Sequence, residues 1–148
     1  MTHVKRVRTN FVRMANHERP LLHAATTQGI LDAFREVHRT FGFGYREFIY
    51  SLAMERELIA RGHRVRREVP IMIYFRGEPL ATQKVDMLVD EVVIVENKAT
   101  EQLHPSANPI LFSYLCSSDL EVGMLLHFGH EAAFQRILCE NRFKRRPK

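Results

Sequence analysis

The sequence predicts an α/β domain in which helices flank a mixed central β-sheet, in the order helix, helix, three strands, helix and strand. Three observations lead to this fold class. Apolar residues recur at helical spacing between residues 27 and 61, and from residue 65 the apolar period changes to two, as in strands. The chain has 148 residues, of which 45% are hydrophobic and 26% charged, which suits one domain with a sizeable core.

The first predicted helix lies in the segment TTQGILDAFREVHRTFG, which begins at Thr26 or Thr27 as an N-cap and ends at Gly42 or Gly44. Its apolar side chains recur every three or four residues, at Ile30, Leu31, Phe34 and Val37. The second predicted helix, YREFIYSLAMERELIARG, ends at Gly62. Apolar residues nearly encircle it, so we expect it to be the most buried helix of the fold.

Glu47 is the unusual residue of the second helix. It lies on one line with Tyr50, Met54 and Leu58, all of which are apolar or aromatic. Two interpretations stay open from the residues alone. The carboxylate is either an acid near the helix N-terminus, where the helix dipole favours negative charge, or a functional group directed into the fold.

The strands follow from alternation of apolar and polar residues. The run from Val65 to Phe75 is the first, and a turn at residues 76–78 ends it. QKVDMLVD and VVIVENK are the next two strands, and SANPILFSYLCSSD is a short helix that begins near Pro109. EVGMLLHFG is a compact apolar strand, whereas AFQRILCE fits either a strand or a helix. His127 and His130, around the end of EVGMLLHFG, are expected in a loop.

A group of charged side chains ends the third strand, where the pattern asks for apolar residues. Glu96 and Lys98 are two residues apart, so they project to one face of the strand, and Asp86 lies on the preceding strand. A turn of only Asp90 and Glu91 would place Asp86 opposite Val95, on the wrong face. Asp86 meets Glu96 only if the turn has an odd number of residues or contains a bulge.

Two carboxylates that converge beside an ammonium group are suited to a hard divalent cation. Like charges at short range repel each other, and Mg²⁺ relieves this repulsion by binding carboxylate oxygens while it keeps several waters. Such a cation acidifies a water and stabilises charge on a scissile phosphate, and Lys98 would orient that water. The alternative is a solvated Glu–Lys pair worth less than about 1 kcal/mol.

Several separated blocks resemble one family. FGFGYREFIY, VDMLVDEVVIVENKA and VGMLLHFG are similar to the bacterial GxxExxY family, a branch of the PD-(D/E)xK nuclease superfamily. The likeness runs from about Ile30 to Leu138. Gly44, Glu47 and Tyr50 match the motif that names the family, and Val85 stands where the superfamily signature has Pro. The resemblance implies a restriction-endonuclease-like core and Mg²⁺- or Mn²⁺-dependent cleavage of phosphodiester bonds.

The resemblance also implies roles for residues. Asp86, Glu96 and Lys98 match the metal-binding and catalytic signature, and Glu47 is the helix acid that completes the metal site; the backbone carbonyl of Asn97 is a further expected ligand. One block departs from the family. Ala107 and Ile110 stand where the family tends to carry His and Gln, while Tyr114 remains. This departure bears on activity more than on metal binding.

Charge and composition indicate the partners and the compartment. The formal net charge is +5, and basic residues cluster at residues 5–13, 61–67 and 142–148, so we expect Arg64, Arg66, Arg67 and the tail to contact phosphates, with Tyr114 also at the nucleic acid. Two cysteines are too few for a disulfide framework, and no apolar run is long enough for a membrane span. We expect buried free thiols in a cytoplasmic protein.

These observations lead to a division of the chain and to three hypotheses for its function. Residues 1–25 are expected to form an arm, residues 26–141 the nuclease-like domain and residues 142–148 a basic tail. The leading hypothesis is a metal-dependent nuclease acting on DNA. The second is a module of the same fold that binds nucleic acid or a protein with weak chemistry or none. The third is a homodimer whose VGMLLHF strand or first helix forms the interface.

Overall fold

The computed structural model describes residues 21–144, and it has the predicted order of elements. The helices are α2 (Ala24–Phe41), α3 (Glu47–Ala60) and α4 (Ala107–Cys116), followed near the end by a short 3-10 helix, Asn141–Phe143. The strands are β1 (Val65–Phe75), β2 (Glu78–Val89), β3 (Val93–Lys98), β4 (Val122–Phe128) and β5 (Ala132–Leu138). The segment that fitted either a strand or a helix is therefore a strand.

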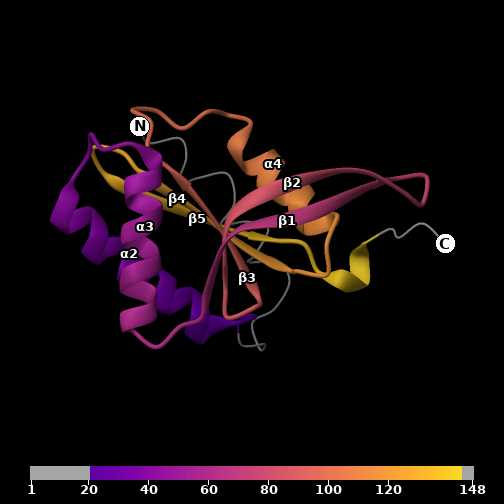
Figure 1. Cartoon of the computed structure of the whole chain (residues 1–148), viewed down its shortest axis with the longest axis horizontal. Coiled ribbons are helices and arrows are strands. Elements are labelled where there is room, and N and C mark those ends of the chain that lie inside the picture. Colours follow the sequence, from indigo (N-terminus) through magenta and orange to yellow (C-terminus); the bar gives the residue numbers. More distant parts are fainter. Residues whose placement is uncertain (1–20, 145–148) are drawn as a thin grey trace.

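The five strands form one mixed sheet in the order β1-β2-β3-β4-β5. Only β3 and β4 are parallel, and α4 is the crossover that connects them; every other neighbouring pair is antiparallel. The α2–α3 pair lies beside the sheet, and the long β1–β2 hairpin extends past α4 (Figure 1). This arrangement confirms the predicted α/β class with a mixed sheet flanked by helices.

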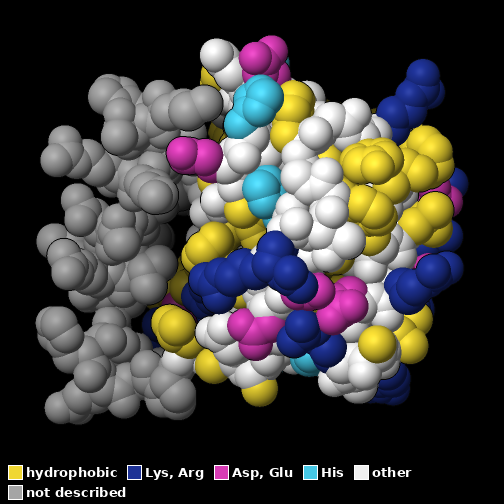
Figure 2. All heavy atoms as spheres, turned by 90° about the vertical axis from the view of Figure 1, so that its left-hand side faces the viewer, with side chains coloured by type: hydrophobic (Ala, Val, Ile, Leu, Met, Phe, Trp, Pro, Cys, Tyr) yellow, Lys and Arg dark blue, Asp and Glu magenta, His cyan; other side chains and the backbone are white. Residues whose placement is uncertain are grey.

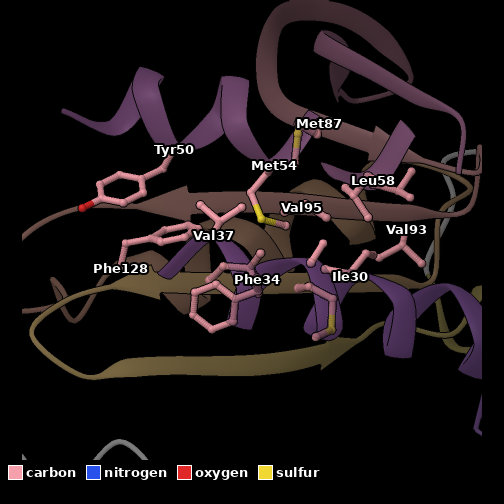
Figure 3. Close-up of a cluster of buried hydrophobic side chains, with 14 of the residues drawn as sticks. Ile30, Phe34, Val37, Tyr50, Met54, Leu58, Met87, Val93, Val95 and Phe128 are labelled. Carbon is pink, nitrogen blue, oxygen red and sulfur yellow. The ribbon is translucent and has the colours of Figure 1, made fainter. Parts of the chain in front are cut away.

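Two apolar clusters cover the two faces of the sheet. The larger packs α2 and α3 on one face, where Phe34, Tyr50 and Phe128 meet with their rings in contact (Figure 3). The smaller cluster packs α4 on the other face, around Leu111 and Leu125. Side chains of β3 therefore alternate between the helix pair and α4, which decides the direction in which each functional residue points.

Several details of the predicted helices were wrong. The first helix begins at Ala24 rather than Thr27; residues 1–20 of the predicted arm lie outside the described residues. The N-cap is His23. Thr26 Oγ1 instead donates to the Asp90 carboxylate, and Thr27 Oγ1 to the Ala24 carbonyl.

Helix α3 is not the most buried helix. It buries one line of side chains, Tyr50, Met54 and Leu58, whereas Phe48 and Ile59 are each 56% exposed. The reason is that α3 packs on α2 and on the sheet along one face only, which leaves its opposite face exposed. The predicted dimer interface on VGMLLHF is also wrong, because β4 lies inside the sheet between β3 and β5 and every β4 residue except His127 is buried. The alternative interface on the first helix stays a prediction.

Two further expectations concern the thiols and the membrane. Cys116 and Cys139 are free, with sulfur atoms 2.7 Å apart; Cys139 is buried and Cys116 half-buried. Burial raises the pKa of Cys116 to about 12, so this thiol is held in its neutral form.

Within residues 21–144, no helix is both long and apolar enough to cross a membrane.

Candidate active site

The β2–β3 turn has the register that the charged group requires. Val89 pairs with Val93 and Met87 with Val95, so the turn contains Asp90, Glu91 and Val92 and places Asp86 opposite Glu96. Asp90 and Glu91 both have positive φ, 53° and 62°, and the Val92 N–H donates to the Val89 carbonyl, as in a tight hairpin turn. Val92 is the extra residue. The odd turn that the meeting of Asp86 and Glu96 requires is present.

The β1–β2 hairpin changes faces where Asp86 lies. Met87 packs with the α2–α3 cluster, but Val85, two residues away on the same strand, packs with the α4 cluster. On β1, Glu68 falls between the pairs Arg67↔Met87 and Val69↔Val85, opposite Asp86, and its φ is 55°. A left-handed residue inside a strand interrupts the regular alternation. The hairpin is therefore kinked at Glu68 and Asp86.

At this kink the backbone pairing of β2 with β3 ends. Carboxylate oxygens, rather than backbone carbonyls, then accept from the backbone N–H groups of the two strands. The Asp86 N–H donates to Glu96 Oε1 over 3.0 Å, and the Asn97 N–H donates to Asp86 Oδ2 over 2.8 Å. Each acid thus satisfies a backbone donor that the sheet no longer pairs. This exchange fixes both carboxyl groups at the point where the two strands part.

Helix α3 supplies the third acid through the Gly44–Tyr50 segment. Gly44 has φ 126°, a conformation that favours glycine, and it leads the chain into α3, whose first residue is Glu47. Tyr50 lies one turn further along. Its hydroxyl donates to the Gly42 carbonyl over 2.6 Å and accepts from the Tyr45 N–H. Tyr50 therefore fixes the α2–α3 connection and, with it, the position of Glu47.

The charges of Glu47, Asp86, Glu96 and Lys98 act on one another in every pairwise combination. Burial is the main cause of the raised pKa values of all three acids, and the Asp86 charge adds to it at Glu47 and Glu96. The pKa of Glu96 rises to about 8. A hydrogen bond between the Glu47 and Asp86 carboxyl groups adds to the raised pKa of Glu47. The four side chains therefore form one electrostatic unit.

Two more side chains border this unit. Lys98 Nζ lies 4.0 Å from Glu96 Oε2, and Lys98 lowers the pKa values of all three acids without cancelling their rise. Tyr114 on α4 has a raised pKa because of burial and of the Glu96 charge. The acids consequently lie between α3 on one side and α4 on the other.

A family model described as the PD-(D/E)XK nuclease superfamily matches residues 24–137. The chain belongs to the PD-(D/E)XK nuclease superfamily. No curated protein and no solved structure matched the chain. Members of this superfamily carry a restriction-endonuclease-like fold, and the mixed sheet with its flanking helices agrees with that fold.

The donor atoms of this PD-(D/E)XK site fit a hard divalent cation. Carboxylate oxygens are the ligands that Mg²⁺ prefers, and three buried acids with raised pKa values are a site where added positive charge is favourable. Within residues 21–144, no three His, Cys, Asp or Glu side chains are arranged so that they could hold a metal ion. Mg²⁺ needs only one or two carboxylates when waters and a substrate phosphate complete its shell. Asp86 and Glu96 supply such a pair.

The expected role of Asn97 is only partly visible. Its side chain is fully buried on the α3 side of the sheet, where Nδ2 donates to Ser51 Oγ over 3.2 Å. Its side-chain Oδ1 is buried without a hydrogen-bond partner. The side chain therefore points away from the face that carries Glu96 and Lys98, and a ligand role for Asn97 rests on its backbone carbonyl.

The structure brings Tyr114 to the acids, but the expected phosphate-contacting arginines lie apart on β1. Arg66 pairs with Glu91 and Arg67 with Glu55, over 2.8 Å and 3.0 Å. Arg64 is exposed at the start of β1, where its backbone N–H donates to Asp90. On the end of the molecule that carries α2 and α3, basic and acidic side chains are likewise interspersed (Figure 2). Any phosphate contact by Arg66 or Arg67 must compete with an existing ion pair.

The basic residues of the tail that the structure describes already contact other groups of the fold. Arg142 pairs with Glu140, and Lys144 Nζ donates to the carbonyls of Ser118 and Leu120. The remaining tail residues, 145–148, lie outside the described part of the chain. On α4, Ala107 is buried and Ile110 is 45% exposed, one turn before Tyr114.

Sequence reasoning missed two residues near the site. Glu68 lies opposite Asp86 and raises its pKa, but an exposed acid on an edge strand gave no signal. His127 was expected in a loop, yet it lies on β4 and pairs with Lys98 across the parallel ladder. What the sequence does not show is the register between VVIVENK and its parallel neighbour, which decides the residue that lies beside each site residue. This register places His127 beside Lys98.

The left-handed backbone at Glu68 leads to a stability prediction. Glu68→Val is expected to lower the free energy of unfolding by about 1–3 kcal/mol, because a β-branched residue tolerates positive φ poorly. Glu68→Gly is expected to be neutral or stabilising, since glycine accepts this conformation. Urea denaturation measures both.

Thr82, an exposed residue of β2 that is not among the positive-φ residues, is the matched control. There valine should be more stabilising than glycine, the reverse of the order at Glu68. The same order of valine and glycine at both positions would contradict a kink imposed by backbone conformation.

Proposed function

We propose that the protein is a metal-dependent nuclease that hydrolyses phosphodiester bonds in DNA, and that it belongs to the GxxExxY branch of its superfamily. The observation that supports this most is the convergence of Glu47, Asp86, Glu96 and Lys98 in one electrostatic unit. They come from a helix and two strands and interact where β2 leaves β3. The backbone N–H groups of Asp86 and Asn97 need acceptors, but uncharged side chains would also supply them. No structural role therefore needs this set of charges together, since buried like charges destabilise a fold.

The chain's own residues divide the chemistry in this proposal. Asp86 and Glu96 bind Mg²⁺ or Mn²⁺, with Glu47 completing the site through water, and with the Asn97 carbonyl as a further ligand. The bound cation supplies a more acidic water and positive charge at the scissile phosphate. Lys98, 4.0 Å from Glu96, orients the attacking water and offsets charge on the phosphate. Arg64, Arg66, Arg67 and Tyr114 contact the nucleic acid.

The test is cleavage of plasmid and single-stranded DNA with Mg²⁺ or Mn²⁺. Asp86→Ala and Lys98→Ala are each expected to lower the cleavage rate by about 10²-fold or more, because each removes a group that acts on the reacting phosphate or water. Lys84→Ala changes an exposed residue and Asp32→Ala a half-buried one, both outside the site, and neither should change the rate. Cleavage that persists in both site variants would exclude this function.

A second candidate is a nuclease-fold module that binds nucleic acid or a protein without turnover. The observation in its favour is Ile110, an exposed apolar residue one turn before Tyr114 on α4. The GxxExxY family tends to have a polar residue at the position of Ile110. Salt-dependent DNA binding without cleavage, together with no heat of Mg²⁺ or Mn²⁺ binding in calorimetry, would select this module. Heat of metal binding that disappears in Asp86→Ala favours the nuclease. A homodimer is compatible with either, and light scattering measures it.

A further inference from the structure

A cavity of about 260 Å³ lies beside the candidate active site, on the α4 face of the sheet. Its floor consists of β4 and β5 side chains, its wall is the loop after β3 and its rim is the β4–β5 turn at residues 129–131. We call it the β4–β5 pocket. The floor side chains are Leu125, His127, Ala133 and Gln135.

The strand register places this pocket next to the catalytic residues. Across the parallel ladder Glu96 pairs with Leu125 and Lys98 with His127, and paired residues point to the same face of a sheet. Leu125 in turn pairs with Gln135, and His127 with Ala133. The pocket floor therefore begins one strand, about 4.8 Å, from Glu96 and Lys98.

The side chains of the pocket suit an uncharged planar ring with hydrogen-bonding edges. Of the described residues that line it, none is Lys or Arg, so it is not built for a phosphate. Gln102 offers a carboxamide, and Glu101 and Glu131 offer carboxylate acceptors, whereas the Gln135 carboxamide oxygen already accepts from Asn108 Nδ2. Its volume lies just below the 300–1,000 Å³ typical of sites for drug-sized ligands, which leaves room for a ligand of limited size.

His127 is held in place as part of the floor. Its Nε2–H donates to the Thr100 carbonyl over 2.7 Å, because a carbonyl only accepts, and this leaves Nδ1 as an acceptor in the neutral ring. A Cβ atom on Gly129 would lie 2.9 Å from the ring, so glycine permits the close approach. The fixed imidazole is a surface on which a base stacks.

We propose that the β4–β5 pocket binds the nucleobase of the nucleotide whose phosphate lies at Lys98. This assignment rests on the proposed nuclease function, because it takes the scissile phosphate to lie at Glu96 and Lys98. A nucleotide held in this way has its phosphate at the acids and its base in the neighbouring pocket. The substrate is then a strand whose base is unstacked at the cleaved bond, which favours single-stranded DNA or DNA ends.

Binding of small probes to the full chain tests the pocket. Deoxynucleoside 5′-monophosphates are compared with 2-deoxyribose 5-phosphate, which lacks the base, by NMR titration in the presence of Mg²⁺. The nucleotides are expected to bind at least tenfold more tightly. Ala133→Trp fills the floor and should remove this difference, whereas Ala132→Trp, on the exposed neighbouring residue outside the pocket, should preserve it.

Two outcomes overturn the proposal: equal affinity for the sugar phosphate and the nucleotides, or an unchanged preference in Ala133→Trp that is correctly folded by its NMR spectrum. Because binding is measured without turnover, failure of the pocket is separate from failure of the nuclease function. If the protein cleaves DNA but binds the sugar phosphate and the nucleotides equally well, only the pocket proposal is contradicted. If the protein prefers nucleotides, Ala133→Trp removes this preference and no DNA is cleaved, only the proposed nuclease function is contradicted.

Discussion

Glu96→Gln is expected to stabilise the metal-free protein at pH 8 and to abolish DNA cleavage. The pKa of Glu96 is about 8 in the folded chain against an ordinary value of 4.5. Between these values the folded state keeps the proton and the unfolded state releases it, so rising pH favours unfolding. The wild type therefore loses stability from about pH 4.5 to pH 8, by an amount on the order of a few kcal/mol. Glutamine carries no charge and keeps the oxygen that accepts the Asp86 N–H.

The measurement is the free energy of unfolding of wild type and variant from pH 5 to pH 8, each with a chelator. Their difference should widen as pH rises, and part of it comes from Glu47 and Asp86, whose charges are no longer opposed by a Glu96 charge in the variant. Glu91→Gln is the matched control: its hydrogen bonds with Arg66 lower its pKa, so its removal should not stabilise the protein at any pH. A difference between wild type and Glu96→Gln that stays constant with pH would contradict the prediction.

Added cation should reverse the order of stability. A ligand at 100 times its Kd stabilises the folded state by about 2.7 kcal/mol, and Mg²⁺ or Mn²⁺ should do so for wild type but not for Glu96→Gln. Cleavage by the variant should fall by about 10²-fold or more, since one of the paired carboxylates is gone. The same substitution would thus stabilise the fold and remove the activity. Equal shifts of the melting temperature by Mg²⁺ in both proteins would exclude Glu96 as a ligand.

The parts of this protein that the sequence predicts well are those that depend on local pattern. Strand alternation located Val65–Phe75 to the residue, and helical spacing located α2 within three residues of its start. Glu96 and Lys98 share a face because they are two apart on a strand, whatever the tertiary fold. The membership of Glu47 in the site came from resemblance, because nothing local to α3 connects it to β2 and β3.

The parts that it predicts poorly depend on what lies outside each segment. Phe48 and Ile59 are large apolar residues, which the sequence alone would assign to the core. They are exposed because α3 packs against one face of the sheet along only one side. Similarly, the positive φ of Glu68 follows from the turn of the whole hairpin onto α4, and no residue near it in sequence is a signal. The β4–β5 pocket was invisible for the same reason, since loop, strand and turn build it together.

The β2–β3 turn lies between these two cases, because its odd length could be stated from the sequence only as a requirement. Asp90 is the residue that meets it. Its Oδ1 accepts from the Arg64 N–H, and its Oδ2 accepts from Thr26 Oγ1 and from His63 Nδ1 over 2.7 Å. One carboxylate thus connects the start of α2, the end of α3 and the start of β1 to the turn. These contacts hold the register on which the meeting of Asp86 and Glu96 depends.

Asp90→Ala is therefore expected to lower the free energy of unfolding by about 2–4 kcal/mol, because it removes three hydrogen bonds and places alanine at a positive φ. Burial acts to raise the pKa of Asp90, yet the bonds from His63, Arg64 and Thr26 hold it below its usual value. This stabilisation is present above pH 4 and is lost as the pH falls through the lowered pKa, so the difference between wild type and variant should shrink in acid to the part that comes from alanine at a positive φ. Urea denaturation at pH 7 and pH 3 measures the difference.

Glu91→Ala isolates the hydrogen bonds from the backbone strain, since Glu91 also has positive φ in the same turn but pairs only at the surface with Arg66. It is expected to cost about 1 kcal/mol, of which the exposed ion pair supplies little. Asp90→Ala should also lower DNA cleavage at a temperature where the variant remains folded, because a turn free to lose its register no longer keeps Asp86 opposite Glu96. Equal losses of stability in the two variants, with cleavage unchanged, would show that turn strain alone, and not the Asp90 carboxylate, sets the register of the site.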